Sequence, residues 1–237
     1  MISPSPPSRT TPRFVSSEAV DAARPLFLLA EILESRYSDL RYHGDAVASY
    51  CEMTAEELGL SRREVGRLAL AGALHDIGKV AIEERILRKE EELTADEWRQ
   101  IELHPDISAN LLFSSDLFDI GRWVRAHHER PDGQGYPRGL AGETIPLEAR
   151  ILAVTDAYDA MRTARVYRAA LSHEQACEEL RRGAGTQFDR RVVEAFLRAM
   201  ARRRRRSRVE KRVNRRGEEV KNGIRPSRTG ISRGRSA

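Results

Sequence analysis

Cysteine is scarce in this sequence. Only Cys51 and Cys177 occur among the 237 residues, and they form no Cys-x-x-Cys pair. A disulfide-stapled miniprotein is therefore excluded, and a reducing cytoplasm is the expected location. Aromatic residues are also few, at 6% of the chain, so Leu, Ile, Val and Ala must fill most of the core.

Long apolar runs are missing as well. No stretch approaches the roughly 18 to 20 apolar residues that span a bilayer, and the best candidates, 68–74 and the run from Leu26, are far shorter. We therefore predict no transmembrane segment. The opening residues, MISPSPPSRTTPRF, contain no apolar stretch of the kind that a secretory signal needs.

Charge is divided unevenly along the chain. The 41 Lys and Arg and 36 Asp and Glu give a net charge of +5. Residues 201–237 hold 15 basic and 3 acidic residues, which leaves 26 basic and 33 acidic residues in 1–200. The body is therefore acidic at −7 and the end is basic at +12, so the overall charge says little about what the body binds.

Helical patterns dominate between a Ser/Pro-rich start and a basic end. Residues 1–19 lack apolar periodicity and are predicted to form a disordered leader, and 201–237 are predicted to form a basic, disordered tail. Strand signals are almost absent from 20–200, where we predict an all-α bundle of about seven or eight helices. The Gly- and Pro-rich stretch 131–146 is predicted to be a loop, and loops of that length are usually functional.

Several helix boundaries can be predicted from local signals. Ser61 followed by Glu64 is a capping-box pattern, as is Thr94 followed by Glu97, and Ser172 with Gln175 is predicted to open another helix. A helix is expected after Pro25. Gly78 is expected to end the helix that begins after Ser61, and the helix that follows Thr94 is expected to carry His104.

Five of the six histidines stand where they could bind a metal ion. Imidazole nitrogen is a common ligand of transition metals, and a carboxylate can bridge two of them. His75 and Asp76 are adjacent at the end of an apolar helix. The residues alone leave two alternatives open. Asp76 could cap a helix or form an ion pair, and His127 and His128 could lie at an exposed helix end. The candidate histidines are His43, His75, His104, His127 and His128.

Two further carboxylates share one predicted helix face. Asp156 and Asp159 lie three residues apart in the run LEARILAVTDAYDAM. Asp156 follows four apolar residues, so an unpaired carboxylate there would be costly. A partner or a metal is therefore expected beside it.

Several common catalytic motifs are absent. The sequence after His128 does not complete His-Glu-x-x-His, which argues against a zinc protease of that type. The segment 133–139 lacks Gly-x-Gly-x-x-Gly spacing, and no phosphate-binding Gly-x-x-x-x-Gly-Lys-Ser/Thr loop occurs. There is no Gly-x-Ser-x-Gly turn for a serine hydrolase.

The order of the remaining motifs resembles that of HD-GYP domains, a branch of the HD metal-dependent phosphohydrolases. The paired signature is HDIGK at 75–79 and HHERPDGQGYP at 127–137. His43, LHP at 103–105, ARILAVTDAYDAM, RVYR at 165–168 and GTQFDRRVVEAF follow the same order as in the family. The resemblance covers about 36–198 and implies an HD-type helical bundle.

The resemblance also implies roles for individual residues. Asp76 would bridge two metals, and Lys79 would stand beside the phosphate as a catalytic residue. Asp39 occupies the place where members with a third metal have Glu, so the shorter acid leaves a third metal open. Substrate would contact Lys79, Gly135, Tyr136, Pro137, Arg165 and Arg168. The implied metal ligands are His43, His75, Asp76, His104, His127, His128 and Asp156.

The implied reaction is hydrolysis of cyclic di-GMP to pGpG, GMP or both, in bacterial second-messenger signalling. Two divalent transition-metal ions are expected, Fe or Mn first, with Ni or Zn as further candidates. Two alternatives stay open: an HD-type phosphohydrolase of monomeric nucleotides, and a catalytically weak module that responds to cyclic di-GMP. Protein signalling partners are a further possibility.

The basic end supports two hypotheses. Arg202 to Arg206 can extend a helix as a basic stripe, whereas Gly217, Gly223 and Gly230 argue against further ordered structure. Such a segment should attract nucleic acid or anionic lipid without sequence specificity. The alternative is an extension that only increases solubility.

Overall fold

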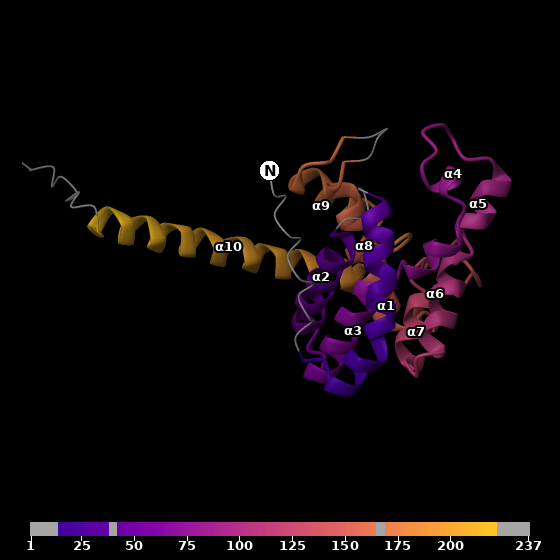
Figure 1. Cartoon of the computed structure of the whole chain (residues 1–237). Helices are drawn as coiled ribbons and strands as arrows, with labels where there is room; N and C mark the ends of the chain where they lie inside the picture. Colours follow the sequence, from indigo (N-terminus) through magenta and orange to yellow (C-terminus); the bar gives the residue numbers. More distant parts are fainter. Residues whose placement is uncertain (1–13, 38–41, 165–168, 222–237) are drawn as a thin grey trace, which may run out of the picture. The chain divides into compact units, whose positions relative to one another are not determined.

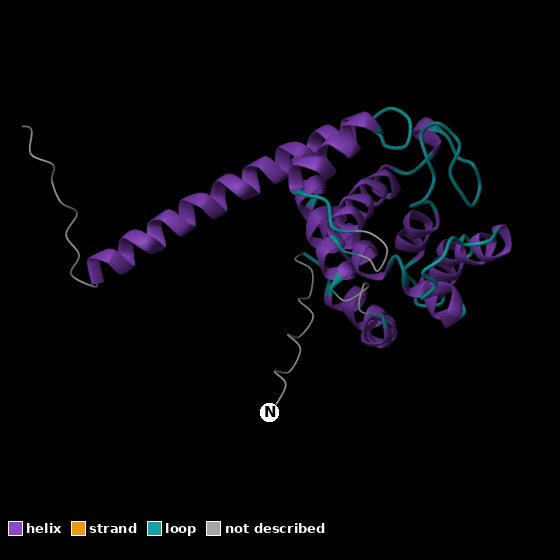
Figure 2. Cartoon of the chain, turned by 90° about the horizontal axis from the view of Figure 1, so that it is seen from above, coloured by secondary structure: helices purple, strands orange, loops and turns teal. Residues whose placement is uncertain are grey.

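The protein is built from helices (Figures 1 and 2). The computed structural model describes residues 14–37, 42–164 and 169–221, and the side chains as far as 206. Across these ranges the backbone forms ten α-helices, two 3₁₀-helices and, in place of strands, one isolated bridge between Ala184 and Phe188. The predicted all-α class is confirmed. The elements are α1 Ser17–Arg36, α2 His43–Glu57, α3 Arg62–Leu74, η1 Ile77–Ala81, α4 Glu84–Leu87, α5 Ala95–Ile101, α6 His104–Phe113, α7 Phe118–Arg125, η2 Gly142–Thr144, α8 Leu147–Arg162, α9 His173–Arg182 and α10 Arg190–Lys221.

Three predicted capping boxes open helices as expected. Ser61 accepts a hydrogen bond from the backbone of Glu64, whose carboxylate accepts one from the Ser61 N–H. The same reciprocal pairs cap α5 and α9. Each box satisfies amide groups that the first helical turn leaves unpaired, which is why these starts are readable from sequence.

A buried helix forms the centre of the body. Seven consecutive residues of α3, 68–74, are buried, so this helix is apolar on all sides rather than on one stripe. Helix α2 packs along α3 and α8, and α6 packs on α7 and η1. Figure 1 shows α1 beside α3. Helices α1 and α6 both pack on η1, which begins three residues after the end of α3.

Four sequence predictions need correction. Helix α1 starts at Ser17 rather than after Pro25, because Ser16 caps it, so the last residues of the predicted leader are helical. Helix α3 ends at Leu74, and Gly78 lies in η1. Helix α5 ends at Ile101, and His104 opens a separate helix, α6. These divisions account for the additional short helices.

The fourth correction concerns the basic end. Helix α10 continues to Lys221, so 201–221 are helical rather than disordered. Arg, Lys and Glu are good helix formers, and the single Gly217 costs only about 1 kcal/mol relative to Ala. The chain divides into two units at 199/200, and α10 contributes to both.

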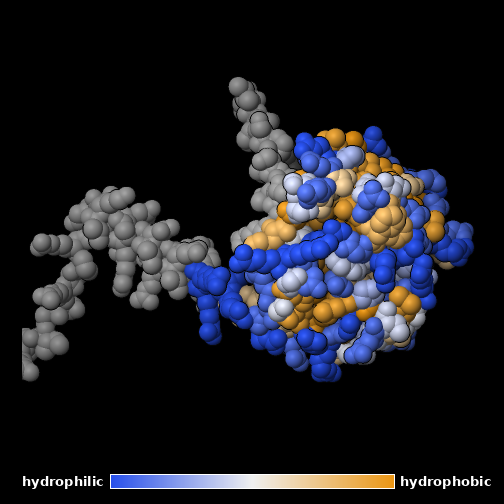
Figure 3. Space-filling view, turned by 90° about the horizontal axis from the view of Figure 1, so that it is seen from below, coloured by the Kyte–Doolittle hydropathy of each residue, from blue (hydrophilic) through white to orange (hydrophobic). Residues whose placement is uncertain are grey.

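The surface of the described part is largely polar. Figure 3 shows hydrophilic residues over much of one face, where they separate several apolar areas. Among the helices that the structure describes, none combines the length and the apolar content needed to cross a membrane.

Candidate metal centre

Seven predicted residues converge where four helix ends meet. They come from five separate parts of the chain: the first residue of α2, the link from α3 to η1, the first residue of α6, the turn after α7, and the middle of α8. Their ligand atoms form three overlapping groups, and the atoms within each group lie within 4.8 Å of one another. The groups are His104, His127 and His128; His43, His75 and Asp76; and His75, His127 and Asp156.

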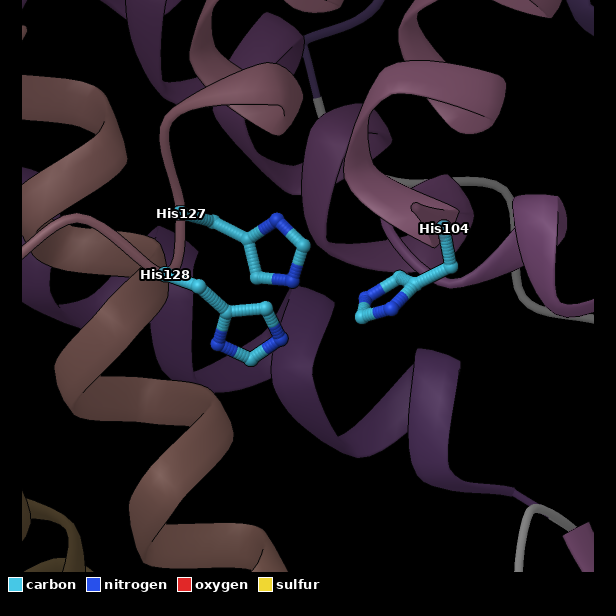
Figure 4. Close-up of side chains that lie close together, drawn as sticks. All are labelled: His104, His127 and His128. Carbon is cyan, nitrogen blue, oxygen red and sulfur yellow. The ribbon is translucent and has the colours of Figure 1, made fainter. Parts of the chain in front are cut away.

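Hydrogen bonds to the backbone fix the rings of three histidines through Nδ1 and leave Nε2 without a hydrogen-bond partner. The Nδ1 atoms of His75, His104 and His127 lie 2.8, 2.7 and 2.5 Å from the backbone carbonyl oxygens three residues earlier. A carbonyl can only accept, so each Nδ1 carries the proton and each Nε2 keeps a lone pair. All three Nε2 atoms are buried without a hydrogen-bond partner. Figure 4 shows His104 facing His127 and His128.

Asp76 lies between two sets of histidines. Its Oδ2 is 3.8 Å from His43 Nε2 and 3.5 Å from His75 Nε2. Its Oδ1 is 3.3 Å from His104 Nε2. The two carboxylate oxygens thus face different imidazoles, which is the arrangement that a bridging carboxylate needs.

Asp156 and Asp159 both reach His43 from α8. Asp156 Oδ1 lies 3.2 Å from His43 Nε2 and 3.7 Å from His75 Nε2. Asp159 Oδ2 accepts a hydrogen bond of 2.7 Å from His43 Nδ1. Asp159 therefore fixes the ring so that Nε2 points to Asp76 and Asp156.

Burial and charge set the protonation of these groups. Burial lowers the pKa of His104 to about 3 and that of His128 to about 4, and it lowers the pKa of His127 well below its usual range. These rings are neutral at neutral pH, which is the form that ligates metals. Burial opposes ionisation of Asp76 as well, but Lys79, His75 and His104 hold its pKa well below the usual value.

Lys79 supplies a fixed positive charge beside this carboxylate. Its Nζ donates a hydrogen bond of 2.6 Å to Asp76 Oδ2. Both side chains are mostly buried, with 20% and 16% of their surfaces exposed. The cation is therefore available to an anion that approaches Asp76.

The predicted loop is anchored beside the histidines. Glu129 is buried and accepts hydrogen bonds from the backbone N–H groups of Arg138 and Leu140, at 2.7 and 2.9 Å. The Tyr136 ring stacks on His128 with 4.8 Å between ring centroids. A Cβ at Gly135 would lie 2.5 Å from the His128 carbonyl oxygen, so only glycine permits this approach. Pro137 follows in the same loop.

The structure brings together most of the predicted site and adds residues to it. Asp39, Arg165 and Arg168 lie outside the described residues. Sequence reasoning gave no site role to Asp159 or Glu129, although the spacing from Asp156 and the position after His128 were available signals. Glu34 of α1, which sequence reasoning did not single out, lines a small cavity with His43 and Asp76.

The donor set fits divalent transition metals. The neutral rings of His104 and His127, each with a free Nε2, lie in one cluster with the ionised carboxylates of Asp76 and Asp156. Imidazole with carboxylate suits iron, manganese, nickel and zinc. Orphaned buried nitrogens are rare unless a ligand satisfies them. The described residues therefore include a cluster that could bind metal.

Comparisons with known proteins agree with this geometry. The family model described as HD domain matches residues 28–192. The chain is 42% identical over 176 residues to the cyclic di-GMP phosphodiesterase response regulator RpfG of Xanthomonas campestris, covering 73% of this chain and 47% of the relative. It is 38% identical over 179 residues to a cyclic di-GMP phosphodiesterase of Thermotoga maritima, covering 73% and 49%.

Other relatives differ in the substrate that their names state. The chain is 37% identical over 175 residues to 3'3'-cGAMP-specific phosphodiesterase 2 of Vibrio cholerae, covering 73% of this chain and 34% of the relative. The chain spans about half or less of the length of these curated relatives.

A solved structure has the same fold. Bd1817 of Bdellovibrio bacteriovorus, titled an HDG"Y"P protein, matches with a TM-score of 0.54 and 18% identity, covering 65% of this chain and 50% of that one. The HD domain match extends over most of the chain, and the residues at 75–79 and 127–137 that carry the HD-GYP signature lie in or beside the histidine cluster. The chain therefore belongs to the HD domain family, in its HD-GYP branch.

Proposed function

We propose that this chain is a metal-dependent phosphodiesterase that hydrolyses cyclic di-GMP to pGpG, GMP or both. The observation that carries the proposal is the position of Asp76, whose two oxygens face separate histidine groups. Relatives named as cyclic di-GMP phosphodiesterases support the substrate.

Two divalent metal ions, Fe or Mn first, would be held by residues on both sides of Asp76. Asp156 lies near His43 and His75, and His104, His127 and His128 form a neighbouring group that shares His127 with His75 and Asp156. Bound there, two metals would neutralise phosphate charge and lower the pKa of a water molecule. Asp39 and a third metal remain an open part of this proposal.

Other residues would bind and orient the substrate. Lys79 would act as a point charge and proton donor at the phosphate, because its Nζ already lies against Asp76. Tyr136 would line the pocket with Gly135 and Pro137. Burial raises the pKa of Tyr136, so its phenol stays a neutral hydrogen-bond donor. Arg165 and Arg168 are proposed to contact guanine-nucleotide phosphates through their planar guanidinium groups.

Purified protein loaded with Mn²⁺ or Fe²⁺ should convert cyclic di-GMP to pGpG or GMP. Separate digests of 3'3'-cGAMP and of monomeric nucleoside triphosphates, each followed by chromatography, distinguish the alternatives. Faster turnover of 3'3'-cGAMP would reassign the substrate to the one that three relatives' names state. Turnover of monomeric nucleotides alone would support an HD-type nucleotide phosphohydrolase, and absence of turnover with retained binding would support an interaction module.

Replacing Asp159 with Asn should weaken metal binding without removing a ligand. The amide no longer accepts the proton of His43 Nδ1 as a carboxylate does, and loss of such an outer partner costs about 10- to 100-fold in metal affinity. Competition with a chelator measures the change. The matched control is Asp21→Asn on the exposed face of α1, which removes the same charge and should leave metal affinity unchanged. Equal affinities for the Asp159→Asn and wild-type proteins would exclude a positioning role.

The cytoplasmic location stays a prediction. It is consistent with Cys51 and Cys177, which are both buried and do not form a disulfide in the part of the chain that the structure describes. Protein signalling partners likewise remain a proposal.

A further inference from the structure

The second half of α10 concentrates positive charge on one continuous helix. Residues 201–221 contain 11 Lys and Arg and 3 Asp and Glu, a net charge of +8. The helix runs through this whole stretch. At 1.5 Å per residue, the stretch is about 30 Å long. Charge on an ordered helix is spaced regularly, which a disordered tail does not provide.

The arrangement of this charge argues against insertion into a membrane. Arg202 to Arg206 are consecutive and exposed, and five consecutive residues at 100° per residue point to all sides of a helix. A helix that lies in a membrane interface needs a broad apolar face opposite its basic one. Residues 201–221 contain only four apolar side chains, those of Ala201, Val209, Val213 and Val220, against 14 charged ones.

A nucleic-acid backbone matches this distribution. Duplex DNA carries one negative charge per about 1.7 Å, so a length of about 30 Å presents about 18 phosphates. Arginine pairs with phosphate through two parallel hydrogen bonds, and Arg-rich helices need no apolar surface to do so. The acidic body, at −7 over 1–200, would be repelled by the same polyanion. Attraction should therefore come from the basic end, of which 201–221 carries +8 of the +12.

From these observations we infer that residues 201–221 form a binding helix for the phosphate backbone of nucleic acid, independent of base sequence. This function is separate from the proposed phosphodiesterase activity, because the residues of the candidate metal centre all precede Arg162. Binding would hold the domain near DNA or RNA through release of counterions.

The test compares full-length proteins that differ only in charge. The helix variant changes Arg202 to Arg206 to Gln, which retains good helix propensity. The matched control changes five exposed arginines of the body to Gln: Arg24, Arg85, Arg99, Arg181 and Arg182. Both variants lose five positive charges. Circular dichroism establishes that each keeps the helix content of the wild type.

Binding is measured by fluorescence anisotropy with a 30-base-pair DNA, a single-stranded RNA of mixed sequence, and vesicles containing phosphatidylserine. Six phosphate contacts would weaken wild-type binding to duplex DNA about 10³-fold between 50 and 200 mM salt. The helix variant should bind at least about tenfold more weakly at 50 mM, and its log–log salt slope should be less steep by about four. The control makes the body more negative and should therefore bind somewhat more weakly than wild type, but it should lose far less affinity than the helix variant and keep the wild-type salt slope.

Three results would overturn the inference. Equal weakening in both variants would show that only net charge matters. Tighter binding to vesicles than to either nucleic acid would assign the helix to a lipid surface. Absence of binding to nucleic acid by wild-type protein at 50 mM salt would reduce the helix to a solubilising extension.

Discussion

Replacing Asp76 with Asn should remove most bound metal from both halves of the proposed centre. The substitution keeps the shape of the side chain but removes its charge and one acceptor, so it can no longer bridge two cations. Transition-state stabilisation by metal is worth several kcal/mol, and about 4 kcal/mol corresponds to about 10³-fold in rate. We expect about two ions per chain in wild type, well under one in the variant, and a loss of about 10³-fold or more in kcat/KM.

Elemental analysis of the purified proteins measures the first effect without depending on the substrate. Asp119→Asn is the matched control, because Asp119 forms an ion pair with Arg67 away from the histidines. The control should keep its metal. A full complement of metal in the Asp76→Asn protein would contradict the bridging role. If the variant loses its metal but neither it nor the wild type hydrolyses cyclic di-GMP, the metal centre is supported and only the proposed substrate is rejected.

Replacing Gly78 with Ala should damage the fold and the centre together. A Cβ at this position would lie 2.2 Å from the His104 carbonyl oxygen and 2.7 Å from the Ser108 backbone nitrogen. Both are backbone atoms at the start of α6, so that end of the helix must move. Overpacking costs about 1–3 kcal/mol, and each kcal/mol lowers the melting temperature of a chain this size by about 2–4 °C.

The same movement would carry His104 away from Asp76. Their side-chain atoms are 3.3 Å apart, and a misplacement of about 1 Å can cost about a hundredfold in rate. We therefore expect lower metal content as well as a lower melting temperature, measured by elemental analysis and differential scanning fluorimetry.

Gly59→Ala provides the matched control for this variant. Gly59 has φ +80°, and an added Cβ meets no atom within 4 Å. The left-handed backbone should cost about 1–2 kcal/mol, comparable with the loss at Gly78. Metal content should nevertheless stay at the wild-type level. If both variants lose metal equally, general destabilisation explains the effect and the contact between Gly78 and α6 does not.

Local interactions made much of the helical architecture predictable. The boxes at Ser61, Thr94 and Ser172 join residues only three apart, so they depend on local sequence and not on how the helices pack. The Nδ1 bonds of His75, His104 and His127 also reach back three residues. Those of His75 and His104 could not be anticipated because both residues were expected inside longer helices. Gly78 was misread for the same reason: its contact is with α6, thirty residues away, and not with its own helix.

The sequence by itself determined the all-α class, the acidic body with its basic end, the capped starts of α3, α5 and α9, and the residues that could ligate a metal. Only the tertiary structure decided which of those residues share a site. His43 meets Asp159 across 116 residues, and Asp76 lies between imidazoles from different helices. The physical reason is that a helix fixes each side chain only relative to its own axis. Packing of α2 on α3 and α8, and of α6 on α7 and η1, sets how those axes lie. Burial there keeps the rings of His104 and His127 neutral, with Nε2 atoms that have no hydrogen-bond partner.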